Sequence, residues 1–331
     1  MRCRALAAVL VAAGLTACAG PGSLLESGRG AALPPSVELR STPFHSQTDQ
    51  QCGPAALATV LGAAGQPVAP ATLEREIFVP GRRGSLQPEL VGAIRARGLL
   101  PYELGGSLDE LAAELAAGRP VLVLQKQGLG PWPAWHYAVA IGYDSERDVV
   151  LLRSGTTERL ELRAPVFDAS WSRAGRWAVV ALEPGTLPAQ PDLSRYVHAT
   201  AALESVGRLD AAAKSYQAAV RQWPDAPMPR FGLANVAAAR GQWSEAERGY
   251  RAALKLEPRL AAALNNRAEA LAQLGCPLTA RRELERGAAA IGPDDPLRAT
   301  LSLTLAELEA RGNTSEAQAC RCYGMDACTA P

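Results

Sequence analysis

Cys52 and its neighbours form the stretch of this sequence best suited to chemistry. The segment from Gln47 to Val60 reads QTDQQCGPAALATV, so that Cys52 precedes Gly53, Pro54 and an apolar, alanine-rich run. Because proline is well tolerated in the first turn of a helix, the motif predicts Cys52 at a helix N-terminus. Unpaired backbone amides and the helix dipole at that end favour the thiolate over the thiol. A cysteine placed there is suited to attack a carbonyl carbon.

His136 is the candidate base for this cysteine. It lies far downstream in the aromatic segment Trp135-His136-Tyr137. Taken singly, each residue has a structural interpretation, since an unpaired cysteine is often a small buried residue and a histidine beside aromatic rings is often a core residue. Together with Gln47, however, the order glutamine, cysteine, histidine is that of a papain-like site. A neutral imidazole beside the thiol can take its proton and later protonate the leaving amine.

Two further groups would complete such a site. The backbone amide of Cys52 and the side-chain amide of Gln47 are the expected oxyanion donors, with Gln51 as the alternative to Gln47. A third group should orient His136, but the strand expected at 149–154 ends without a carboxylate. The hydroxyl of Ser154 or a backbone carbonyl is the remaining candidate, and cysteine–histidine sites tolerate a neutral partner.

The turn carboxylates are too far along the strand to orient His136. A hairpin that turns near Ser145 would place Ser154 or Gly155 opposite the histidine. Asp144 would then lie roughly 16 Å or more from the ring, at about 3.3 Å for each residue.

The elements that must position these residues predict an α+β domain over 36–185. Four helices come first, at 52–64, 71–76, 85–97 and 107–117. Ser85 is the expected N-cap of the third helix. Strands are expected at 120–125, 136–142, 149–154, 158–163 and 176–182. Helices followed by an antiparallel sheet are the α+β layout, which is also the papain-like layout.

The second half of the chain repeats itself. Gly207, Gly241 and Gly275 are 34 residues apart, and alanine and tyrosine or leucine positions keep the same step. A 34-residue period with small residues at helix contacts is the tetratricopeptide pattern. The sequence therefore predicts three repeats and a final helix over 192–311, an all-α solenoid. A plain alanine-rich bundle is the alternative.

The N-terminus predicts export. Arg2 and Arg4 precede an apolar run that is too short to span a membrane and that ends in Leu-Thr-Ala-Cys at Cys18. This resembles a bacterial lipoprotein signal over 1–17, which implies that Cys18 is acylated and holds the protein at a membrane. Ala19 is not the aspartate that retains such proteins at the inner membrane, so the outer membrane, facing the periplasm, is expected. An ordinary secretory signal is the alternative.

The remaining cysteines and the net charge limit the possible partners. After Cys3 is removed with the signal, and with Cys18 and Cys52 assigned, four cysteines remain, an even number that suits disulfides in an oxidising compartment. They are Cys276, Cys320, Cys322 and Cys328. A zinc site is the less favoured alternative, because no histidine is near. The net charge of +1, without a basic block, argues against a nucleic-acid partner, and no cofactor is expected.

The whole chain resembles bacterial lipoproteins that join a papain-like peptidase domain, of the type found in bacteriocin exporters, to tetratricopeptide repeats. The segments QCGPAALA, WHYAVAIGYD and LRSG carry this resemblance. In those exporters the glutamine usually lies six residues before the cysteine and an aspartate orients the histidine, whereas here Gln47 lies five before Cys52 and the aspartate is missing.

The resemblance implies a cysteine peptidase in which Cys52 attacks and His136 acts as base and then acid. It also implies repeats that bind a peptide or a partner protein. Two alternatives remain open: a non-catalytic adaptor of the same architecture, and an amidase or acyl transferase that uses the same pair. We expect a tether at 18–35 and a cysteine-rich tail at 312–331.

Overall fold

The computed structural model describes residues 33–46, 51–79, 81, 84–128, 134–292 and 294–310. Several sequence predictions lie outside the described residues. These are the signal segment with Cys18, the tether, Gln47, and the tail with Cys320, Cys322 and Cys328. Among the described residues, no helix is both long and apolar enough to cross a membrane.

The first half of the chain is an antiparallel sheet covered by helices, as predicted. Its strands are β1 (Ser36–Glu38), β2 (Leu100–Glu103), β3 (Val121–Gln127), β4 (Ala134–Asp144), β5 (Val149–Ser154), β6 (Thr157–Arg163) and β7 (Ala178–Leu182). The strand order is β2-β7-β3-β4-β5-β6, and β1 pairs with β4. The helices are α2 (Cys52–Ala63), α3 (Pro70–Ile77), α4 (Gln87–Ala96), α5 (Leu108–Ala116) and α6 (Ala164–Ser172).

Alternate residues of β4 build two cores, one on each face of the sheet. Val139 and Ile141 pack with α2, α3 and α4, and Leu57 of α2 is fully buried among them. Ala138 belongs to the other core, beneath α5 and α6, where Trp171 is fully buried. Since side chains of a strand alternate between faces, this period fixes which residues of β4 each layer of helices meets.

The N-caps of α4 and α5 differ in kind. Ser107 caps α5, because its side chain accepts a hydrogen bond from the backbone N–H of Glu110. The expectation for Ser85 was wrong, because α4 begins at Gln87 with Leu86 as its N-cap. A proline follows Gln87 and occupies the first turn of α4, where its missing N–H costs nothing. The short strand β2 and the helix α6 were not predicted.

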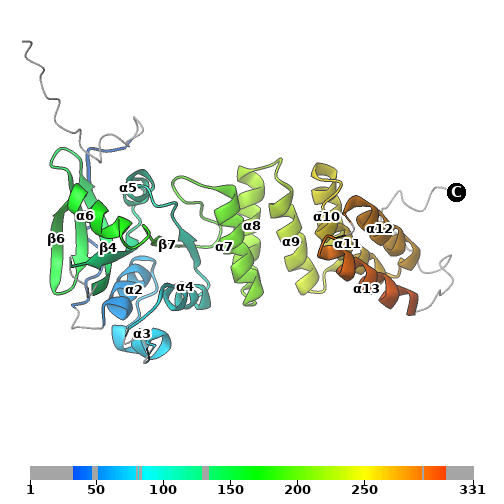
Figure 1. Ribbon diagram of the computed structural model, residues 1–331, viewed down its shortest axis with the longest axis horizontal. Coiled ribbons are helices and arrows are strands. Elements are labelled where there is room, and N and C mark those ends of the chain that lie inside the picture. The colour runs from blue at the N-terminus through cyan, green and yellow to red at the C-terminus, as the bar shows by residue number, and fades with distance from the viewer. Residues whose placement is uncertain are drawn as a thin grey trace, which may run out of the picture.

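The second half of the chain is a run of antiparallel helices, in agreement with the repeat prediction. They are α7 (Leu193–Ser205), α8 (Leu209–Gln222), α9 (Pro227–Ala239), α10 (Trp243–Leu256), α11 (Ala261–Gln273), α12 (Pro277–Ala290) and α13 (Leu297–Ala310). Gly207, Gly241 and Gly275 connect the two helices of each pair with φ of 74°, 71° and 79°. This left-handed conformation is costly for other residues, which explains the repeated glycine. Figure 1 shows these helices extending away from the sheet.

One hydrophobic core runs from the sheet into the first repeat. Tyr102 of β2 and Tyr196 of α7 are both fully buried in it, with ring centroids 6.4 Å apart. Arg195 adds an ion pair to Glu110 of α5, with Nη2 and Oε1 2.6 Å apart. The backbone N–H of Asp192 donates to the hydroxyl of Tyr102. The first repeat is therefore packed onto the sheet domain, next to β2 and β7 (Figure 1).

A buried ion network joins the later repeats. Arg267 of α11 lies between two carboxylates, 2.9 Å from Glu247 of α10 and 3.0 Å from Glu283 of α12. Glu247 is fully buried and Glu283 is nearly so. The guanidinium therefore neutralises two buried carboxylates and ties three consecutive helices together.

Candidate active site

Cys52 is the first residue of α2, as the Cys-Gly-Pro motif predicts. Gln51 is the N-cap residue, and its side chain does not cap the helix. Cys52 is partly exposed and contacts the core between α2 and the sheet. The thiol therefore lies at the positive end of the helix dipole, where negative charge is stabilised.

The start of α2 fits closely against two other segments. A Cβ placed on Gly53 would lie 2.8 Å from the Cβ of Ser85 and 3.7 Å from the Tyr137 ring. The hydroxyl of Tyr137 donates to the backbone carbonyl of Ser85 over 3.3 Å. Only a residue without a side chain allows this approach, which gives a packing reason for the glycine after Cys52.

Tyr137 and Ser85 are neighbours of Cys52 that the sequence did not reveal. Burial raises the pKa of Tyr137, and negative charge on Cys52 and Glu89 raises it further. Tyr137 is therefore a neutral side chain at the start of α2, with its ring near Gly53 and its hydroxyl bonded to Ser85. Its position next to His136 in the sequence was the available signal, whereas nothing in the spacing indicated Ser85.

His136 is held by Ser154. Its Nε2 lies 2.9 Å from the Oγ of Ser154. The register continues from the pair Val139 and Arg153, so the two residues lie diagonally across β4 and β5. An irregularity between Ala140 and Gly142 shifts this register. The sequence placed Ser154 or Gly155 directly opposite. The observed offset comes from the turn, where Asp144 pairs with Val149, and the irregularity moves the register one residue back toward the expected pairing.

The environment of His136 favours a neutral ring. Burial lowers the pKa of His136 below its usual 6.5, because an imidazolium loses hydration there. If Nε2 carries the proton and donates it to Ser154, Nδ1 is left as a bare acceptor. A bare ring nitrogen can serve as a base toward a thiol.

Cys52 and His136 come from different elements, and the alternation along β4 places Tyr137 on the face that α2 covers and His136 on the face toward α6. Helix α2 packs on β4, and Cys52 is next to Gly53, which approaches Tyr137. His136 is paired across the strands with Gln125, whose Nε2 donates to Ser170 of α6. Within the part of the chain that the structure describes, no hydrogen bond joins the Cys52 thiol to the His136 ring. The Cys52–His136 pairing stays a prediction.

The remaining candidates are placed as follows. The side chain of Gln51, the alternative oxyanion donor, donates to Glu74 of α3 over 3.2 Å. Asp144 accepts the backbone N–H of Glu146 and Arg147 at the turn, away from His136. Trp135, which precedes His136 in the sequence, is the second residue of β4 and is 53% exposed.

Cys276 is buried in the core of the last repeats, at 4% exposure. Its three proposed disulfide partners lie outside the described residues, so the disulfides stay a prediction. No group of three or more metal-ligating side chains occurs among the residues that the structure describes.

Comparisons with known families match both halves of the chain. Residues 40–179 match the Peptidase_C39 like family, and residues 196–247 and 231–296 match the tetratricopeptide repeat family. A search of curated proteins finds no match.

Solved structures are similar to each half separately. A Bacillus anthracis protein, provisionally named a C39-like peptidase, is 22% identical, with 44% of this chain and 96% of that one covered and a TM-score of 0.37. The Yersinia enterocolitica chaperone SycD, in complex with a peptide of the translocator YopD, is 19% identical, with 36% and 93% covered and a TM-score of 0.34. The TPR2B domain of yeast Sti1, in a complex with Hsp70, is 12% identical, with 36% and 98% covered and a TM-score of 0.35.

The two family matches agree with the order of elements, the sheet with its helices first and the helical pairs second. The chain therefore carries a Peptidase_C39-like domain followed by tetratricopeptide repeats.

Proposed function

We propose that this protein is a cysteine peptidase in which Cys52 is the nucleophile and His136 the base. The hydrogen bond between His136 Nε2 and Ser154 Oγ is the observation that carries the proposal. It fixes the ring and leaves Nδ1 to receive the thiol proton. The thiolate at the start of α2 then attacks the peptide carbonyl, and the imidazolium protonates the leaving amine. Water releases the acyl-enzyme, which restores the thiol.

The oxyanion donors in this proposal are the Cys52 backbone amide and the side chain of Gln47. The Cys52 amide belongs to the first turn of α2, where backbone N–H groups have no helical partner. Gln47 is favoured over Gln51, because the Gln51 amide already donates to Glu74. A Gln47→Ala variant should lower kcat by about a hundredfold or more, the usual cost of one oxyanion donor.

The nucleophile is tested by labelling with iodoacetamide or an epoxide probe at neutral pH. The proposal predicts that Cys52 reacts faster than the thiol of a free peptide, and that His136→Ala slows the reaction. Equal rates in wild type, in His136→Ala and in the free peptide would remove the enzymatic interpretation. Peptide-library cleavage by wild type, with Cys52→Ala as the blank, then separates a peptidase from an amidase or acyl transferase.

A non-catalytic adaptor is the second candidate, and two observations favour it. The alternation along β4 directs His136 to the face of the sheet opposite α2. The partner of His136 is the neutral hydroxyl of Ser154 rather than a carboxylate, which stabilises an imidazolium less strongly. An adaptor would bind its partner equally well as wild type and as Cys52→Ala, and neither of these two proteins would cleave peptides.

We further propose that acylated Cys18 holds the protein at the outer membrane, facing the periplasm. The apolar run that ends in Leu-Thr-Ala-Cys supports this anchor. Labelling cells with a clickable palmitate analogue should mark wild type and not Cys18→Ser. A label that remains in the variant would rule out this attachment site.

A further inference from the structure

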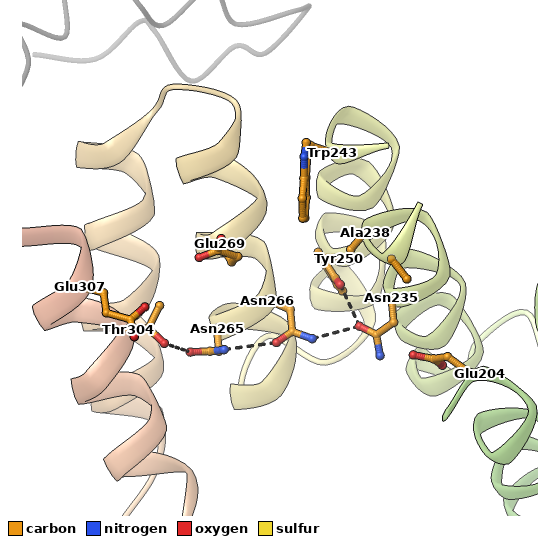
Figure 2. Close-up of a pocket in the computed structure, with 11 residues that line it drawn as sticks. Glu204, Asn235, Ala238, Trp243, Tyr250, Asn265, Asn266, Glu269, Thr304 and Glu307 are labelled. Atoms are coloured by element: carbon orange, nitrogen blue, oxygen red, sulfur yellow. Dashed lines mark hydrogen bonds between the residues drawn. The ribbon is translucent and has the colours of Figure 1, made fainter. Parts of the chain in front are cut away.

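A groove lies along the repeats, on a face built by the first helix of each pair. Its volume is about 560 Å³, and side chains from α7, α9, α11 and α13 line it, with Trp243 and Tyr250 of α10 behind them. Figure 2 shows these side chains directed toward one shared space. The groove belongs to the repeats and contains neither Cys52 nor His136.

A chain of hydrogen bonds between amide side chains runs along the groove. Thr304 donates to Asn265 over 3.1 Å, Asn265 to Asn266 over 3.2 Å, and Asn266 to Asn235 over 3.0 Å. The hydroxyl of Tyr250 also donates to Asn235, over 2.8 Å. These bonds hold three carboxamides in fixed orientations on α9 and α11 (Figure 2).

The carboxamides keep unused capacity for a ligand. Each amide nitrogen has two hydrogens. The bonds within this chain use one hydrogen of Asn265, whereas Asn266 donates to Asn235 and also contacts the Tyr250 hydroxyl. Carbonyl oxygens also accept two bonds, so Asn265 and Asn266 can each take another donor. A carboxamide can pair with a peptide group through both its N–H and its C=O. Fixed carboxamides along a groove are therefore suited to an extended peptide backbone.

Every charged side chain that lines the groove is a carboxylate. Glu204 of α7, Glu269 of α11 and Glu307 of α13 are spread along its length, and no lysine or arginine occurs among the described lining residues. The indole of Trp243 is half-buried at the same groove. A carboxylate attracts a cationic side chain, and an indole face can add a cation–π contact.

We propose that this groove binds an extended peptide segment of a partner protein that carries lysine or arginine side chains. The proposal rests on the proposed function of the repeats as the partner-binding half of the protein. The carboxamides bind the backbone of the segment and the carboxylates select its charge. A polyamine would satisfy the charge but not the carboxamides, so a peptide is favoured.

The test uses the full chain with Cys52→Ala, so that no bound peptide can be cleaved. Three fluorescent peptides of equal length share an alanine background and carry lysine, glutamine or glutamate at the same alternate positions. In fluorescence anisotropy the lysine peptide should bind about tenfold more tightly than the glutamate peptide, and added salt should narrow the difference. Equal affinity for the two peptides, or competition by spermine as effective as by unlabelled lysine peptide, would overturn the proposal.

Matched variants locate the site. Glu269→Gln and Glu307→Gln should each weaken the lysine peptide by up to about fivefold and leave the glutamine peptide unchanged. Glu245→Gln removes the same charge from a position of α10 outside the groove and should change neither. Asn266→Ala should weaken both peptides alike, because it removes backbone contacts. If Glu245→Gln lowers the affinity for the lysine peptide as much as Glu269→Gln does, the peptide does not bind in this groove.

This test is independent of catalysis. The rate at which iodoacetamide labels Cys52 in otherwise wild-type protein should be the same in Glu269→Gln and Glu307→Gln. If the lysine peptide binds but wild-type protein shows no peptidase activity, the groove proposal stands and the peptidase proposal fails. If wild-type protein cleaves peptides but the lysine peptide does not bind, the peptidase proposal stands and the groove proposal fails.

Discussion

His136 Nε2 and Ser154 Oγ lie 2.9 Å apart across β4 and β5. This contact places a hydroxyl where a carboxylate would stabilise an imidazolium more strongly. The rest of the sheet aligns the two residues, because Ser154 ends β5 and His136 lies near the start of β4. The strength of this one contact is therefore expected to tune the reactivity of Cys52.

Two substitutions of Ser154, to alanine and to aspartate, should change the strength of His136 as a base in opposite directions. Ser154→Ala removes one hydrogen bond, so the Cys52 alkylation rate should fall about five- to tenfold, the equivalent of about 1 to 1.5 kcal/mol. Ser154→Asp should raise the pKa of His136 and move the acid limb of the rate profile to higher pH. Ser172→Ala, an exposed serine of α6, is the control. Identical pH profiles for all variants would show that Ser154 does not act on the ring.

Burial of His136 should make folding stability depend on pH. Because its pKa is lowered in the folded state, the unfolded chain binds more protons once the pH falls below 6.5. The stabilisation linked to neutral His136 is fully present above pH 6.5, and it is lost as the pH falls to the pKa that His136 has in the folded protein. The loss is about 1.4 kcal/mol for every tenfold difference between the acid constants of the folded and unfolded states. Urea unfolding at several pH values should show this loss in wild type and less of it in His136→Gln. If the free energy of unfolding depends on pH in the same way in wild type and in His136→Gln, the prediction is wrong.

Gly53 should not tolerate a methyl group. The Cβ of Gly53→Ala would meet the Ser85 Cβ at 2.8 Å, so the start of α2 or the segment before α4 must move. We expect a loss of about 1–3 kcal/mol and slower labelling of Cys52. Gly92→Ala is the matched control inside α4, where nothing lies within 4 Å, and it should stabilise by about 0.5–1 kcal/mol. Unchanged labelling in Gly53→Ala would show that the helix start is not constrained.

The sheet domain and the first repeat should unfold together. Tyr196→Ala empties a fully buried site in the core that both halves share, at an expected cost of about 3–5 kcal/mol. Hydrogen exchange should then increase in β2 as well as in α7. Tyr250→Ala, in the core of the later repeats, should leave β2 unchanged. Increased exchange confined to α7 would show that the halves are independent.

Arg267 should be more important for stability than for binding. Arg267→Met leaves Glu247 and Glu283 buried without their shared cation, which should cost about 3–5 kcal/mol. Arg281→Met, at an exposed ion pair on α12, should cost no more than about 1 kcal/mol. Thermal unfolding measures the stability of both variants, and equal losses in the two would contradict the prediction.

The sequence by itself determined the elements with strong local signals. The Cys-Gly-Pro motif specified the start of α2, because proline fixes φ at a helical value. The Gly207, Gly241 and Gly275 spacing specified the repeats, because glycine adopts the left-handed turn that other residues adopt only at a cost. It did not predict β2, whose four residues are too few for a period, or α6, whose burial decides its conformation.

Only the tertiary structure decided the contacts between distant segments. The hydrogen bond from His136 to Ser154 depends on a shift in strand register near Ala140, and no local pattern specifies where such a shift occurs. The approach of Ser85 to Gly53 and the carboxamide chain along the groove depend in the same way on how whole helices pack. These contacts join residues far apart in the chain, so their geometry follows from packing rather than from spacing.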